Sequence, residues 1–143
     1  MKTLLIVLMA FILVPFVSAQ TEQFPQEQKS VIVENLNVGI KSDNYGLRTS
    51  SANVLFDLIN ESYLQSEDAS KSMIPLLIML ENGKTDEERI AAALALFKLG
   101  NRIGIYRLRG VAIFDDNARV STICKNLYYS YHKLNGTEYL IDF

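Results

Sequence analysis

From residue 29 onward, apolar residues recur at the spacing of one helix face, and no alternating run typical of a β-strand persists. The clearest stripe lies in the last segment, where apolar and aromatic residues follow one another at steps of three and four. Its members are Val120, Ile123, Cys124, Leu127, Tyr128 and Tyr131. The pattern predicts six helices, at 29–40, 45–60, 72–81, 86–99, 102–113 and 116–133.

Boundary signals support this division of the chain. Thr85 followed three residues later by Glu88 fits a capping box, in which the threonine accepts from the amide of Glu88 and the glutamate reaches back. Gly100 and Gly136 stand where the fourth and sixth helices should stop. The fourth helix is apolar or alanine on nearly every face, so we expect it to lie in the interior.

The first 19 residues differ from the rest of the chain. A positive start at Lys2 precedes an apolar run, and small residues at Ser18 and Ala19 precede a polar segment. This is the pattern of a secretory signal peptide, with cleavage expected after Ala19. An uncleaved membrane anchor is the alternative. The protein is therefore expected to be exported, either to a periplasm or outside the cell, without membrane insertion after cleavage. Residues 20–28 are polar and predict a flexible lead-in.

Three segments align when the second helix of each pair is superimposed. Each has an arginine in its first turn, at Arg48, Arg89 and Arg119, followed by small residues and by an apolar residue eight positions later. A repeat of 30–40 residues containing two helices is typical of an α-solenoid. The expected fold is an all-α superhelix of about three helical hairpins, at 29–60, 72–99 and 102–133. The repeat domain then covers 29–133, and 134–143 form a tail that could fold back over the last hairpin.

The central repeat resembles a HEAT repeat of the armadillo-type class. Residues 73–80 (MIPLLIML) are similar to its first helix and residues 85–101 to its second, followed by a similar start to the next repeat. The matching positions are Asp86, Arg89, Ala91, Ala92, Ala93, Leu99 and Gly100. The resemblance extends weakly over 29–133 and is strongest over 72–120. It implies a helical solenoid and leaves the function open, since such folds have many roles.

The repeated arginines have two interpretations. Each arginine could pair with an acidic residue in the turn of a neighbouring repeat, for example Arg89 with Asp43 or with Asp116. Such a ladder of ion pairs would stabilise the stack. Alternatively, the arginines could bind a ligand. The ladder is the favoured interpretation.

Composition and charge narrow the function classes. Loss of Lys2 with the signal leaves 13 basic against 16 acidic residues, a net charge of −3 that is not typical of a nucleic-acid binder. Cys124 is the only cysteine, so we expect a small buried side chain and not a disulfide. His132 is the only histidine and is expected at the surface of a helix end. No catalytic, metal-binding or cofactor-binding pattern is present, and neither an enzyme nor a cofactor is expected.

Basic and tyrosine residues gather between 101 and 134, a composition that suits a protein-contact surface. A solvated face with core tyrosines is the alternative. The predicted contact residues are Arg102, Tyr106, Arg107, Arg109 and Tyr129. The sequence therefore predicts an exported, non-enzymatic module that binds or scaffolds another protein, of unknown oligomeric state. The alternatives are a self-associating structural envelope protein and, less favoured, a small accessory enzyme.

Overall fold

The computed structural model describes residues 24–137, and within them the chain is all-α, with six α-helices, one short 3-10 helix and no strand. The predicted signal peptide lies outside the described residues. So do 20–23 of the predicted lead-in and 138–143 of the predicted tail. The helices are α1 (Gln26–Ile40), α2 (Tyr45–Asn60), α3 (Met73–Asn82), α4 (Asp86–Leu99), α5 (Arg102–Phe114) and α6 (Ala118–Asn135), with the 3-10 helix η1 (Ser70–Ser72) before α3.

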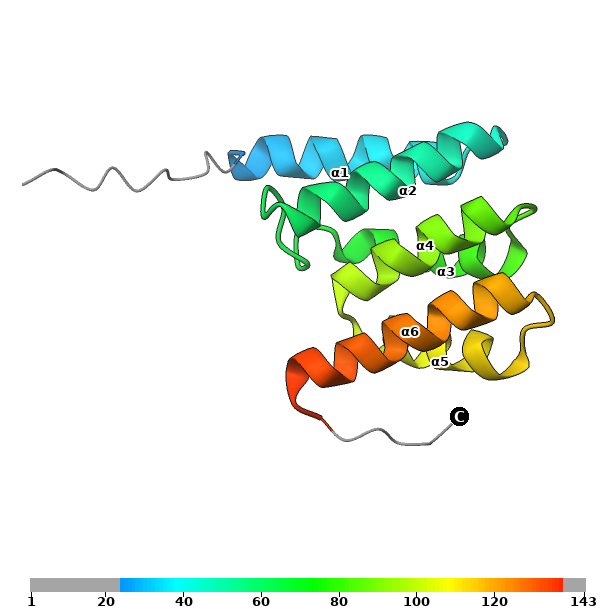
Figure 1. The fold of residues 1–143 in the computed structure, drawn as a ribbon. Helices are drawn as coiled ribbons and strands as arrows, with labels where there is room; N and C mark the ends of the chain where they lie inside the picture. The colour runs from blue at the N-terminus through cyan, green and yellow to red at the C-terminus, as the bar shows by residue number, and fades with distance from the viewer. Residues whose placement is uncertain (1–23, 138–143) are drawn as a thin grey trace, which may run out of the picture.

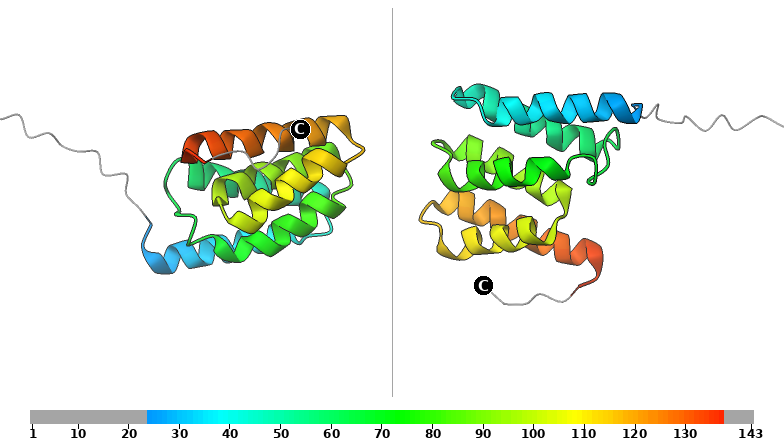
Figure 2. Two further views of the ribbon diagram at one scale, coloured as in Figure 1. Left: turned by 90° about the horizontal axis from the view of Figure 1, so that it is seen from below. Right: turned by 180° about the vertical axis from the view of Figure 1, so that it is seen from behind.

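Consecutive helices pair as three hairpins, α1–α2, α3–α4 and α5–α6, and the hairpins stack on one another (Figure 1). The second helices, α2, α4 and α6, form one closely packed layer, and α1, α3 and α5 form another that packs more loosely between hairpins (Figure 2). The predicted three-hairpin organisation is therefore confirmed.

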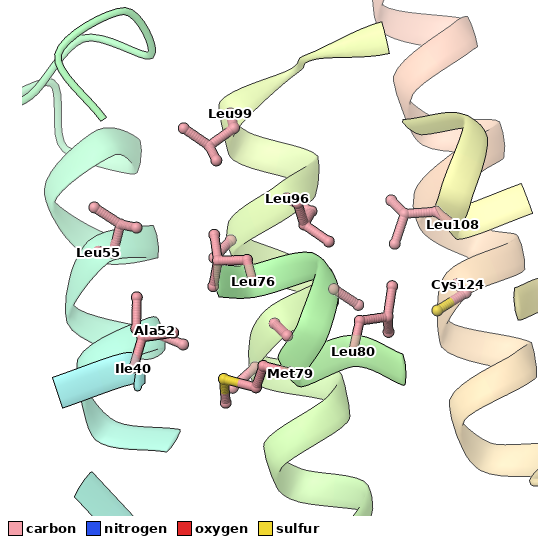
Figure 3. Close-up of a cluster of buried hydrophobic side chains, with 14 of the residues drawn as sticks. Ile40, Ala52, Leu55, Leu76, Met79, Leu80, Leu96, Leu99, Leu108 and Cys124 are labelled. Carbon is pink, nitrogen blue, oxygen red and sulfur yellow. The ribbon is translucent and has the colours of Figure 1, made fainter. Parts of the chain in front are cut away.

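One continuous core runs through the stack, and α4 lies at its centre. Its residues Ala92, Ala93, Ala95 and Leu96 are fully buried, as the all-round apolar pattern predicted. Figure 3 shows side chains of α3 and α4 between those of α2 on one side and those of α5 and α6 on the other. The small alanine side chains let the neighbouring helices approach α4 closely, which explains why α2 and α6 both pack against it.

The first helix begins at Gln26, three residues earlier than predicted, so residues 26–28 of the predicted lead-in are helical. Pro25 occupies the N-cap position, where its missing N–H is not needed. Asp68 then fixes this end, because its carboxylate accepts from Gln26 Nε2 at 3.0 Å and from Lys29 Nζ at 3.1 Å. The start of α1 therefore depends on a residue about forty positions away, which a local pattern does not reveal.

The connection between α2 and η1 covers residues 61–69. In the structure it contributes two buried side chains to the core, Leu64 at 1% exposure and Ala69 at 0%. The backbone is tied to the end of α2 by a bond from Leu64 N to Leu58 O at 3.0 Å. This loop therefore closes the gap between the first two hairpins.

The last helix begins and ends two residues later than predicted. Asn117 caps its start, because its side-chain oxygen accepts from the amides of Arg119 and Val120 at 3.1 Å. Gly136, in the left-handed conformation at φ 61°, follows its end at Asn135. The first two residues of the predicted tail are thus helical, and the helical domain reaches 135 instead of 133.

Candidate functional site at the last hairpin

A cavity of about 780 Å³ lies at the last hairpin, against α5 and the end of α6. This volume is in the range of ordinary ligand pockets. Apolar and aromatic side chains make up most of its wall. The lining residues are Arg102, Ile103, Ile105, Tyr106, Tyr128, Tyr131, His132, Asn135 and Thr137.

Two of the five predicted contact residues, Arg102 and Tyr106, line this cavity, and both are exposed on α5. Tyr106 is 65% exposed. Arg109 lies outside the lining, but its guanidinium stacks over the Tyr106 ring at 5.7 Å from the ring centroid. This contact is within the range of a cation–π interaction and orients the tyrosine at the cavity edge.

The other two predicted residues lie elsewhere. Arg107 is exposed and forms an ion pair with Glu81 of α3, so its charge joins two hairpins. Tyr129 is half-buried on α6 and packs edge-on to Tyr128, with ring centroids 6.2 Å apart. Neither residue lines the cavity, so the predicted patch is divided between the cavity and its surroundings.

His132 is a cavity residue that the sequence interpretation missed. Its ring packs edge-on to Tyr128 at 4.5 Å and to Tyr131 at 5.6 Å between centroids. Its Nδ1 is 2.6 Å from the hydroxyl of Thr137, a hydrogen bond that spans the end of α6. The imidazole is therefore part of an aromatic wall and is only half-exposed.

The cavity exists because α6 is longer than the helices that correspond to it. Beyond the aligned arginine, α6 continues for 16 residues (120 to 135), whereas α2 continues for 12 (49 to 60) and α4 for 10 (90 to 99). Figure 1 shows the red end of α6 reaching past the end of α4. The extra turn carries His132 and Asn135 and forms one side of the cavity.

The described part of the lining carries nitrogen-bearing side chains and no carboxylate. Arg102 brings the hydrogen-bond donors of its guanidinium, and His132 brings its imidazole ring. The aromatic rings next to these groups provide apolar contact area. A cavity with this composition suits a ligand that combines an apolar or aromatic group with a negative charge.

The three repeat arginines form the predicted ladder of ion pairs, with partners other than those suggested. Arg48 of α2 pairs with the buried Glu88 of α4. Arg89 of α4 binds Asp115, in the turn before α6, through both guanidinium nitrogens. Asp43 and Asp116, the partners suggested from sequence, are not bonded to Arg89. The reason is that Asp115 directly follows α5 and faces the start of α4.

The third arginine pairs with the preceding hairpin, whereas Arg48 and Arg89 pair with the hairpin that follows. Arg119 of α6 donates to Glu87 of α4 at 2.7 Å. In the same cluster, Asn117 donates to Asp86 at 2.6 Å. All three arginines are therefore engaged with acidic residues of a neighbouring hairpin, which favours the structural over the ligand-binding interpretation.

The ion pairs shift the ionisation of their carboxylates. The bond from Arg89 lowers the pKa of Asp115 and outweighs the effect of burial. Burial raises the pKa of Glu88, but the bonds from Arg48 and from the amide of Lys84 outweigh it and hold the pKa below its usual value. Both groups are therefore charged at neutral pH and bonded.

Other candidate chemistry is limited in the described part of the chain. Cys124 is fully buried, as predicted, and burial raises the pKa of its thiol to about 12. Between residues 24 and 137, no three histidine, cysteine, aspartate or glutamate side chains are grouped so that they could hold a metal ion. No helix in this range has the length and apolar character needed to cross a bilayer.

In comparisons with known proteins, no family model, curated protein or solved structure matches the chain. The candidate site therefore rests on the geometry of the last hairpin.

Proposed function

We propose that this protein is an exported, non-enzymatic module related to HEAT repeats that binds another protein at its last hairpin. Three stacked hairpins, each with an arginine at the same place in its second helix, support the repeat relationship. Export is supported by the signal pattern at residues 1–19. Helical stacks of this kind commonly present extended binding surfaces.

The observation that carries the proposal is the cavity between α5 and the overhanging end of α6. It has aromatic walls, the guanidinium of Arg102 and the imidazole of His132 at its rim, and no acidic lining residue among those that the structure describes. Tyrosine and arginine are the residues that most often dominate binding energy at protein interfaces. The fitting partner is therefore a protein segment that places an apolar or aromatic side chain beside a carboxylate.

The test is crosslinked affinity capture from the native host, quantified by mass spectrometry, with two pairs of matched variants. Tyr106→Ala is compared with Tyr45→Ala, because the two tyrosines are 65% and 63% exposed and lie at opposite ends of the stack. Arg102→Glu is compared with Lys41→Glu, which makes the same charge change at an exposed residue far from the cavity.

A partner bound at the cavity should be captured at least tenfold less by each cavity variant and normally by each control. This corresponds to the loss of about 1.4 kcal/mol or more at a hot spot. Equal capture by the cavity variants and their controls would refute the site. Circular dichroism of each variant checks that the helical stack is intact.

A second candidate function is self-association. Phe114 at 82% exposure, Leu134 at 77% and Ile103 at 59% leave large apolar side chains uncovered around the last hairpin. A mass that increases with concentration, and decreases again on Phe114→Ser, would favour this function. A constant monomer mass would count against it. No observation in residues 24–137 favours the accessory-enzyme alternative.

A further inference from the structure

The cavity has a neighbour in the sequence that matches its chemistry. Thr137, the last residue described, lines the cavity, so the segment that follows it begins at the cavity rim. Residues 138–143 read Glu-Tyr-Leu-Ile-Asp-Phe. We infer that this segment is an internal ligand that occupies the α5–α6 cavity and competes with the external partner. The competition rests on the proposed function, whereas the occupancy does not.

Charge complementarity is the first argument. The segment carries two carboxylates, Glu138 and Asp142, and no basic residue. Among residues 24–137, the cavity lining carries Arg102 and His132 and no carboxylate. Opposite charges that approach each other in a partly apolar cavity attract more strongly than they do in open water. The segment therefore has the opposite charge to the described lining of the cavity.

Apolar complementarity is the second argument. Four of the six residues are apolar or aromatic: Tyr139, Leu140, Ile141 and Phe143. The cavity wall offers the exposed side chains of Ile103 and Tyr106, at 59% and 65% exposure, for them to cover. Covering apolar area is worth about 25 cal/mol per Å², so a few such side chains would offset the cost of ordering a short segment.

Reach and tethering are the third argument. Six extended residues span at most about 20 Å, which is sufficient for a segment that starts at the rim of the cavity. A short tether gives the segment an effective concentration in the millimolar range. A segment with an intrinsic Kd of about 0.1 mM would therefore fill the cavity for about nine-tenths of the time.

Occupancy has a predictable effect on the external partner. The apparent affinity decreases by the fraction of molecules whose cavity is open. If the segment fills about nine-tenths of the cavities, the partner binds about tenfold more weakly than it would to an empty cavity. The segment would then set a threshold that only a better-matched partner overcomes.

Occupancy is tested by a photo-reactive benzoylphenylalanine placed at position 140 of the chain from Gln20 to Phe143. Crosslinks within a single chain to residues 102–106 or 128–135, identified by mass spectrometry, are the expected result. The same reporter in an Ile103→Asp background is the control, and it should lose most of these crosslinks. Crosslinks from position 140 to other regions, or only between two copies of the chain, would overturn the inference.

Competition is tested by capture of the partner. Leu140→Asp should release the segment and raise capture by about tenfold, whereas Leu134→Asp, at an exposed leucine outside the lining, should not. Unchanged capture by Leu140→Asp would overturn the competitive role. If crosslinks to the cavity persist while Arg102→Glu and Tyr106→Ala leave capture unchanged, the proposed function fails and the internal occupancy stands. The reverse pattern leaves the proposed function standing and rejects the occupancy.

Discussion

Replacing Glu88 by glutamine should destabilise the stack, although the substitution conserves size and shape. Glu88 is 1% exposed, and its carboxylate accepts from Arg48 Nε and, at 3.0 Å, from the amide of Lys84. Glutamine has only one side-chain acceptor oxygen and turns an NH₂ group towards one of these two donors. The substitution therefore removes a charge-assisted bond and leaves a donor facing a donor.

The magnitude follows from these contacts. A hydrogen bond to a charged group is worth about 1.5–3 kcal/mol, and a buried polar group left unsatisfied costs about 1–3 kcal/mol. Arg48 keeps a second bond, from its NH1 to the carbonyl of Ser42 at 2.6 Å, and its side chain is 16% exposed. The charge of Arg48 therefore does not become buried without a hydrogen-bond partner. We expect a loss of about 2–3 kcal/mol in the free energy of unfolding.

The assay is urea and thermal unfolding followed by circular dichroism. A loss of 2–3 kcal/mol should lower the Tm by about 8–12 °C for a domain of this size. Glu87→Gln is the matched control, because Glu87 is the neighbouring carboxylate, is 62% exposed and pairs with an exposed arginine. We expect the control to cost less than about 0.5 kcal/mol.

A double-mutant cycle decides whether the effect belongs to the ion pair. Arg48→Ala and Glu88→Gln should together cost at least about 1 kcal/mol less than the sum of the two single changes, because each removes the same bond. Additive effects within about 0.5 kcal/mol, or equal losses from Glu88→Gln and Glu87→Gln, would refute the reasoning.

Three further outcomes are expected. Gly39→Ala should lower the free energy of unfolding by about 1–3 kcal/mol in chemical denaturation, because its new Cβ would lie 2.0 Å from Ser51 Oγ. Adding Ser51→Gly to the same chain should restore most of this loss. A single variant that is more stable than the original chain would contradict the prediction. The thiol of Cys124, with a pKa of about 12, should resist alkylation at pH 8 until urea unfolds the chain. The carboxylates of Glu88 and Asp115 have pKa values lowered by folding, so their stabilisation is complete above their ordinary values of 4.5 and 3.8 and is lost as the pH falls below them. The Tm should therefore be flat from pH 7 to 5 and should fall below about pH 4, less steeply in Glu88→Gln.

Local patterns were sufficient for the helices whose ends are fixed by neighbouring residues. Helix α2 has the predicted bounds, and Asn44 caps its start through a bond from the amide of Leu47. At the predicted capping box, Thr85 accepts from the amide of Glu88, and the Glu88 carboxylate also accepts from the amide of Lys84 and from Arg48. The local pattern does not reveal the bond to Arg48, which comes from another hairpin.

The candidate site could be predicted only in part. Arg102 and Tyr106 were found because basic and tyrosine residues gather between 101 and 134, a signal that local composition carries. His132 was missed because a single histidine near a helix end has no local feature that distinguishes it. The signal that could have found it is the length of the last helix beyond its aligned arginine, which is visible only once the repeats are compared.

The overhang of α6 is also held in place by the rest of the stack. A helix end that extends past its neighbours tends to fray unless something holds it. Here the Tyr131 hydroxyl donates to the carbonyl of Gly100 at 3.2 Å, which fixes the extra turn to the junction of α4 and α5. Gly100 itself adopts the left-handed conformation, at φ 62°, that this junction requires. The cavity is thus formed between elements that are already held in place, and binding there would incur little cost for ordering its walls. The same residues that end one repeat therefore also build the surface on which the proposed binding depends.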